Sequence, residues 1–145
     1  MNYFKAAEDL LRSVPTLERA LENLRKRERR LLDSGAPRTS GIDYEKSYAG
    51  AHFANDALNE LLELTECEKN IAATESELSE VRDVIGQLDT EQARLVRLWY
   101  IDRYTKERIM EEMHIESPTT VYNLRNRAVA EFALLYYGAA ALPSI

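Results

Sequence analysis

Cysteine is almost absent from this chain of 145 residues, which contains only Cys67. A single cysteine excludes an internal disulfide and is typical of a reducing compartment, so we expect a cytoplasmic protein. Histidine is nearly as scarce, with His52 and His114 alone, and no cysteine or second histidine stands close to His114. A metal such as zinc needs several such ligands together, so we expect neither a metal site nor a cofactor.

Turn-forming residues are also rare, with 5 glycines and 4 prolines in the chain. Few tight turns are therefore available, and the 45% of apolar residues are enough to form a core, so we predict an all-α fold. No run of roughly 18 apolar residues occurs, which predicts no membrane span and no membrane partner. The first residues, MNYFKAAEDLLRSV, contain acids and no apolar block, so we expect no signal peptide.

The motifs of common enzyme classes are missing. The sequence contains no HExxH, GxSxG or GKS/T pattern. The segment DSGAPRTSG at 33–41 contains glycine, but it lacks the lysine and the helix entry of a phosphate-binding loop. The many glutamates follow the charge pattern of solvated helices. We therefore predict that the protein is not an enzyme.

The chain contains two heptad seams, which are stripes of apolar residues along two predicted helices. Leucine and valine recur in steps of four and three on a first helix, whose first turn we expect at Pro15 and whose seam Glu28 interrupts. A second helix is predicted from about Asp56 to Leu88, with Cys67 as a core residue on its seam. The seams consist of Leu10, Val14, Leu17, Leu21, Leu24 and Leu31, and of Leu64, Cys67, Ile71, Thr74, Leu78, Val81, Ile85 and Leu88.

These seams predict a long coiled-coil-like helical hairpin over residues 1–88, with a loop at about 33–56. The two seams either pair within one chain or pair with another chain, because both geometries need the same apolar stripe. We expect a homodimer or higher oligomer through the hairpin.

Charge is distributed unevenly along the chain. The net charge of −6 argues against binding of nucleic acid by the whole surface. Residues 60–93 hold ten acids and two bases, whereas residues 94–127 hold seven bases and five acids. A local positive surface can bind phosphate on a protein that is acidic as a whole.

The segment 89–145 carries the signals of a helix-turn-helix domain. Asp89 or Thr90 can cap one helix, and Thr105 can cap a short second helix. Ser117 followed by Pro118 is a strong start for a third helix, because the serine hydroxyl can accept a hydrogen bond from a free N–H of the first turn. We expect this helix to run to about Tyr137 and to stop at Gly138. A short helix, a turn and a capped helix are the order that places a recognition helix in the DNA major groove.

The third helix has one face suited to DNA. At ~100° per residue, Val121, Leu124, Ala128 and Phe132 cluster on one side, which we predict to be buried. No acid occurs between Glu116 and Glu131, as expected for a helix lying between two rows of phosphates. The opposite face carries Thr119, Asn123 and Asn126, flanked by Thr120, Tyr122 and Arg127.

These side chains have chemistry that can read DNA. Asparagine can pair with adenine through two hydrogen bonds, and threonine can contact a thymine methyl group. We therefore predict Thr119, Asn123 and Asn126 as base readers, with Thr120 and Tyr122 at the flank. The start of the helix at Ser117 aims N–H groups at a phosphate. The predicted contacts to the DNA backbone are Arg103, Lys106, Arg108, Arg125 and Arg127.

The segment LDTEQARLVRLWYIDRYTKERIMEEMHIESPTTVYNLRNRAVAEF resembles the fourth region of bacterial sigma factors. It is more similar to phage-encoded sigma-like regulators of the ArpU and RinA type. The segment TVYNLRNRAVAEFALLYYG of this chain also resembles the last helix of those regulators. The resemblance covers residues 88–138 by motif and the helical residues 1–87 by architecture alone. It implies control of late or packaging genes of a phage, in a Gram-positive bacterial host or a prophage, with double-stranded DNA as partner. We expect the acidic coiled coil to dimerise the protein, to contact RNA polymerase, or both.

The chain departs from this pattern at the turn. Many helix-turn-helix units have alanine where Met110 stands and glycine where His114 stands, and their turn is one residue shorter. His114 can adopt a left-handed conformation, although less readily than glycine. Beyond residue 128 the same side of the helix becomes apolar, so we expect it to pack on the hairpin or on a second subunit; these residues are Ala130, Ala133, Leu134 and Tyr137.

Three functions fit these observations. The first is a sequence-specific DNA-binding transcriptional regulator. The second is a helical interaction protein that does not bind DNA, anti-sigma-like or a scaffold, which the net acidity favours. The third is a small terminase subunit, although that family, unlike this chain, has its DNA-binding unit first.

Overall fold

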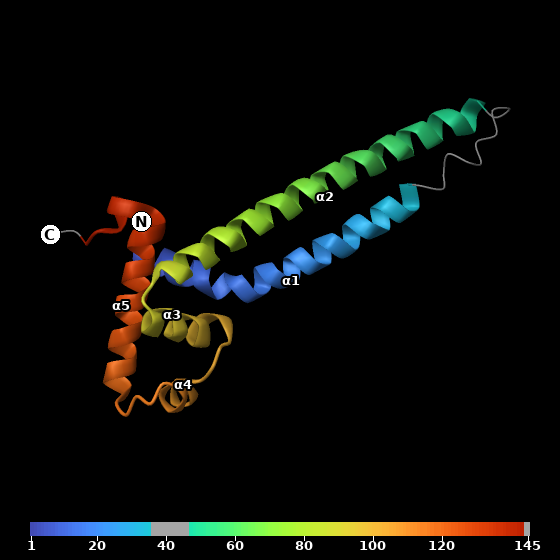
Figure 1. The fold of residues 1–145 in the computed structure, drawn as a ribbon. Helices are drawn as coiled ribbons and strands as arrows, with labels where there is room; N and C mark the ends of the chain where they lie inside the picture. The colour runs from blue at the N-terminus through green and yellow to red at the C-terminus, as the bar shows by residue number, and fades with distance from the viewer. Residues whose placement is uncertain (36–46, 144–145) are drawn as a thin grey trace. The chain divides into compact units, whose positions relative to one another are not determined.

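The computed structural model describes residues 1–35 and 47–143, without the side chains of 35 and 47–54, and every element within them is helical. This confirms the predicted all-α class. None of the described helices is both long enough and apolar enough to cross a membrane. The elements, shown in Figure 1, are α1 (Tyr3–Gly35), α2 (Ser47–Gln87), α3 (Thr90–Val96), the π-helix η2 (Arg97–Ile101), α4 (Lys106–Glu112), α5 (Pro118–Tyr137) and the 3-10 helix η3 (Gly138–Ala141).

Helix α1 begins at Tyr3, so the prediction that Pro15 lies in the first turn is wrong. The residues before the proline carry an apolar stripe of their own, because Ala7, Leu11 and Val14 are at most 1% exposed. Burial of this stripe favours the helix more than Pro15, which has no N–H to donate to the carbonyl of Leu11, disfavours it.

Helix α2 begins at Ser47, whereas the sequence predicted a loop at 33–56 and a start near Asp56. Residues 33–35 belong to α1, and residues 36–46 lie outside the described part of the chain. Three alanines stand between Ser47 and Asp56, and alanine is the strongest helix former. The predicted seam of α2 holds, since all eight of its residues are buried or half-buried, with Cys67 at 3% exposure.

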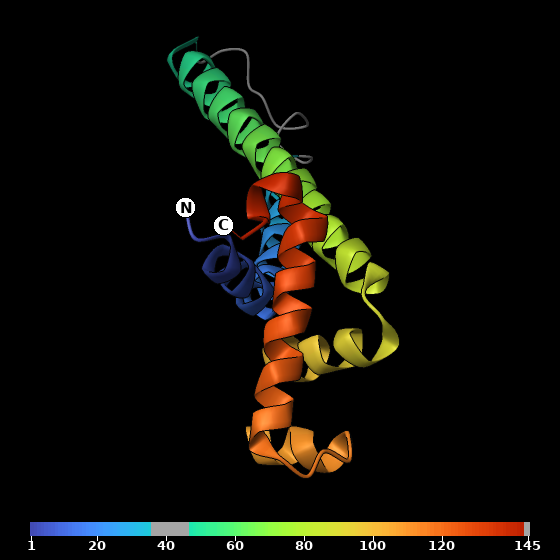
Figure 2. The same ribbon diagram turned by 90° about the vertical axis from the view of Figure 1, so that its left-hand side faces the viewer.

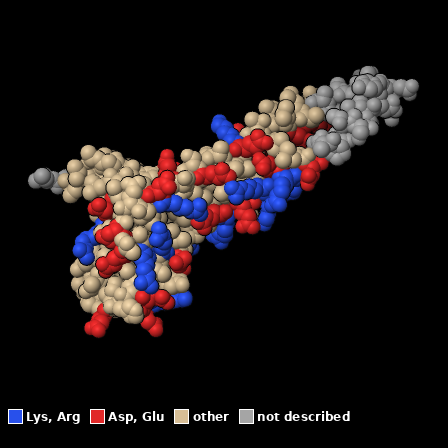
Figure 3. All heavy atoms as spheres, in the orientation of Figure 1, with Lys and Arg blue, Asp and Glu red and all other residues tan. Residues whose placement is uncertain are grey.

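The chain divides into two compact units, and the first consists of residues 18–76. Here the second half of α1 and the first part of α2 run antiparallel (Figure 1). The Cys67 thiol donates to the carbonyl of Leu24 at 3.3 Å, and Arg25 pairs with Glu75 at 2.5 Å. Lys and Arg side chains gather over this half of α1 in Figure 3, where the sequence places RKRERR at 25–30.

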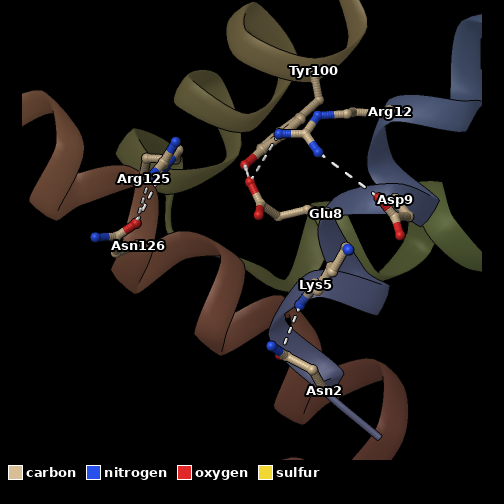
Figure 4. A network of polar contacts seen from close by, with 8 residues as sticks. All are labelled: Asn2, Lys5, Glu8, Asp9, Arg12, Tyr100, Arg125 and Asn126. Carbon is tan, nitrogen blue, oxygen red and sulfur yellow. Dashed lines mark hydrogen bonds and ion pairs between the residues drawn. The ribbon is translucent and has the colours of Figure 1, made fainter.

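The other unit consists of residues 1–17 and 77–145, so its boundary differs from the predicted one at residue 88. Aromatic side chains of the last third contact both long helices. The Tyr100 hydroxyl donates to Glu8 at 2.7 Å (Figure 4), and the Tyr136 hydroxyl donates to Glu77 at 2.8 Å. Burial raises the pKa of Tyr100, and the hydrogen bond to the Glu8 carboxylate raises it further. Tyr100 therefore stays a neutral donor that holds α1 to η2.

Candidate nucleic-acid interface

Helices α3, α4 and α5 form the frame of the candidate interface. The Asp89 carboxylate accepts from the Gln92 N–H at 2.8 Å at the start of α3, and the Thr105 hydroxyl accepts from the Arg108 N–H at 3.3 Å at the start of α4. Thr105 was predicted as a cap, and Asp89 was one of the two predicted candidates, the other being Thr90. Helix α5 starts at Pro118, ends at Tyr137 and has Gly138 as its C-cap, also as predicted. Ser117 is its N-cap residue but makes no side-chain cap hydrogen bond, so that part of the prediction is wrong.

A small apolar core joins α3, α4 and α5. Leu95, Ile109, Val121 and Leu124 are buried at its centre. In both views α4 lies at the N-terminal end of α5 (Figures 1 and 2). The predicted buried face of α5 is confirmed at all four positions. Half-buried apolar side chains surround the core: Leu98, Trp99, Tyr104, Met110, Met113 and Ile115.

The turn between α4 and α5 is closed by two backbone hydrogen bonds. Ile115 N–H donates to the Met110 carbonyl at 2.8 Å, and His114 N–H donates to the Glu111 carbonyl at 3.3 Å. This is the Schellman pattern, which needs a left-handed residue one position after the C-cap. His114 occupies that position with φ of 55°, as the sequence suggested. The turn thus keeps its geometry although it lacks the glycine common at this place.

Replacing His114 by glycine should stabilise the protein. A side chain in the left-handed region costs about 1–2 kcal/mol, and the greater freedom of glycine in the unfolded chain cancels part of the gain. We expect a net gain of about 0.5–1 kcal/mol and a rise in melting temperature of roughly 2–3 °C. Thermal unfolding followed by circular dichroism measures it, with His114→Ala as the control. A glycine variant no more stable than the alanine variant would contradict strain at this residue.

The outward face of α5 is open to solvent. Thr119, Asn123 and Asn126 are all exposed, so nothing in the described part of the chain covers the predicted readers. Tyr122 is also exposed, at 39%. The surface over the first turns of α5 is largely uncharged in Figure 3. The flanking residues Thr120 and Arg127 complete this exposed face.

An aromatic cluster beside this face holds Arg125. Its guanidinium lies over the Trp99 ring at 5.0 Å and over the Tyr122 ring at 5.4 Å. The Arg125 Nε and Nη2 atoms also donate to Asn126 Oδ1, at 3.2 and 2.9 Å. The contact with Trp99 was not predicted, because it joins α5 to the π-helix η2 and no local pattern of residues reveals it.

The predicted phosphate contacts fall into two groups. Arg103 donates to the Arg12 carbonyl at 3.2 Å, and Arg125 donates to Asn126, so both guanidinium groups are already bound within the protein. In the second group, two charged side chains lie near aromatic rings. The Lys106 Nζ atom lies 5.5 Å from the centre of the Tyr122 ring, and the Arg108 guanidinium lies 3.7 Å from the centre of the Tyr104 ring. Arg127 is exposed on α5 itself.

The second half of α5 packs within its own unit. Ala133 is buried, and the Tyr137 ring lies 5.2 Å from the Tyr3 ring of α1. Leu134 is half-buried within the chain, whereas Ala130 is exposed, so the predicted packing on a second subunit stays open for Ala130. Part of the apolar continuation is therefore covered in cis. Among the described side chains, those of residues 1–34 and 55–143, no three His, Cys, Asp or Glu side chains are grouped to bind a metal ion.

A family model described as a protein of unknown function, DUF1492, matches residues 50–133. No curated protein and no solved structure matches the chain. The matched range includes α3, α4 and all exposed residues of the candidate face on α5.

Proposed function

We propose that this chain, which belongs to the DUF1492 family of proteins of unknown function, is a sequence-specific DNA-binding transcriptional regulator. The observation that supports this most is the exposed face of α5, where Thr119, Asn123 and Asn126 stand together without an acid from residue 117 to 130. The opposite face of the same helix is buried. A helix with this division can enter the major groove while it stays fixed to its own domain.

In this proposal α5 lies in the major groove as the recognition helix. Thr119, Asn123 and Asn126 contact base edges, and the first N–H groups of α5 face a phosphate. Lys106, Arg108 and Arg127 contact the DNA backbone and fix the register. We assign Arg103 and Arg125 to holding the fold, because their guanidinium groups donate hydrogen bonds to other residues of the protein.

We further propose that α1 and α2 form a coiled-coil-like hairpin that precedes the helix-turn-helix. Leu58, Leu61 and Leu62 recur at helical spacing on α2 and are 53–59% exposed. Such a stripe is costly in water, so we propose that a second copy covers it in a homodimer. Light scattering tests this, since a mass of 16.7 kDa would exclude the dimer. The resemblance to phage regulators supports RNA polymerase as a further partner and late or packaging genes as targets.

The rival function is a helical scaffold or anti-sigma-like protein that does not bind DNA. It is favoured by the net charge of −6 and by the ten acids of residues 60–93. Such a protein would show no salt-dependent retention of DNA, whereas a regulator would.

The test of the proposed function uses the full chain, because the unit that holds α5 includes residues 1–17. Fragments of random double-stranded DNA are bound at several salt concentrations, and the retained fragments are sequenced. We expect a shared sequence among them, and affinity that falls as salt rises. Retention of no DNA would refute the regulator and leave the scaffold.

Replacing Arg127 by alanine should lower the slope of log affinity against log salt by about one, since one phosphate contact is lost. Affinity should fall by a similar factor for every sequence. The matched control is Lys69→Ala, which removes the same charge from an exposed position on α2. An equal change of slope in the two variants would argue against a phosphate contact at Arg127.

A further inference from the structure

We propose that Arg125 determines which base Asn126 prefers, by holding the Asn126 amide so that only N–H donors face outward. This inference rests on the proposed function and names a specificity-determining residue within it. Arg125 then acts as a positioning residue, and the base contacted by Asn126 is guanine instead of adenine.

The orientation of the Asn126 amide follows from the chemistry of its neighbour. A guanidinium group has only donors, so the amide atom that it contacts must be the oxygen. Two donors, Nε and Nη2 of Arg125, reach Asn126 Oδ1 at 3.2 and 2.9 Å (Figure 4). A carbonyl oxygen has two lone pairs, and these two contacts occupy both. The two N–H donors of the Asn126 amide remain for a ligand.

Arg125 is itself fixed in place. Its side chain is half-buried, and its guanidinium stands over the rings of Trp99 and Tyr122 at 5.0 and 5.4 Å. These rings meet edge to face, with centroids 5.7 Å apart. A cation over aromatic faces is attracted by their negative charge distribution. Arg125 therefore does not need to be ordered when DNA binds, and Asn126 meets the groove with its oxygen already bound.

This state of Asn126 matches one base better than the others. Guanine presents two acceptors in the major groove, N7 and O6, which suit an amide that offers only donors. Adenine presents one acceptor and one donor, and the adenine donor would find the Asn126 oxygen occupied. Cytosine presents a donor, which would face the Asn126 donors directly.

The experiment measures base preference with the full chain, by selection from random DNA followed by affinity for single-base variants of the selected site. The base pair read by Asn126 is the one whose preference Asn126→Ala abolishes. At that pair the wild-type protein should prefer guanine over adenine by about tenfold. Arg125→Met keeps an unbranched side chain on the rings but frees the Asn126 oxygen, so the preference should move to adenine. Arg127→Met, the matched control, should weaken binding to all sequences without changing the preference.

A second variant does not depend on how Arg125→Met folds. Asn126→Asp has the same shape and keeps an oxygen for Arg125, but its outward atom becomes an acceptor. The preference should then move from guanine to cytosine, by about tenfold. The inference is overturned if the wild-type protein prefers adenine, if Arg125→Met retains the guanine preference, or if Asn126→Ala changes no base pair. These results leave the DNA-binding function intact, whereas failure of the wild-type protein to bind any DNA overturns both.

Discussion

Replacing Ile109 by alanine should lower the free energy of unfolding by about 2–5 kcal/mol. Ile109 is 0% exposed and is the one fully buried side chain of α4, a helix of seven residues. A helix this short is not stable alone, so its place depends on packing. Loss of the side chain leaves a cavity between Leu95, Val121 and Leu124, which α3 and α5 can fill only in part.

The measurement is urea unfolding followed by circular dichroism and by tryptophan fluorescence. Trp99 is the only tryptophan and packs against this core, so its fluorescence reports directly on the packing of α3, α4 and α5. The matched control on the same helix is Glu107→Ala, whose side chain is 78% exposed, and we expect a change within about 0.5 kcal/mol. A loss below about 1 kcal/mol for Ile109→Ala would show that α4 does not depend on this contact.

Local signals in the sequence predicted where helices of the last third begin and which face of α5 is buried. Asp89, Thr105 and Pro118 act through atoms within three or four residues, so the chain order alone reveals them. The same holds for the buried face of α5, because a helical period fixes which side chains share a side.

Contacts between residues far apart in the chain could not be predicted from local sequence patterns. The first helix begins before Pro15 because its early residues are buried in a unit that also contains the end of the chain. The hydrogen bond from Tyr100 to Glu8 joins residues 92 positions apart, and no periodicity predicts it. The contact between Arg125 and Trp99 is of the same kind: four residues after Val121, Arg125 lies only ~40° from the centre of the buried face, yet its partner comes from another helix.

Replacing both Asn123 and Asn126 by alanine should remove most of the discrimination between the selected DNA site and unrelated DNA. A well-placed polar contact to a base is worth about 1–3 kcal/mol of discrimination. The two losses together should reduce the preference for the site by about 2–6 kcal/mol, which is at least ~30-fold. Affinity for unrelated DNA should change little, because it depends on phosphate contacts that remain.

The double variant is compared with Asn59→Ala plus Asn70→Ala, which makes the same change at exposed positions of α2. Alanine favours a helix more than asparagine does, so neither variant should unfold, and a loss of discrimination in the first alone points to base contacts. If the first variant keeps its preference within about twofold, Asn123 and Asn126 are not readers. Any remaining selectivity would then come from the shape of the DNA, which α5 would sense through phosphates and not through its amide groups.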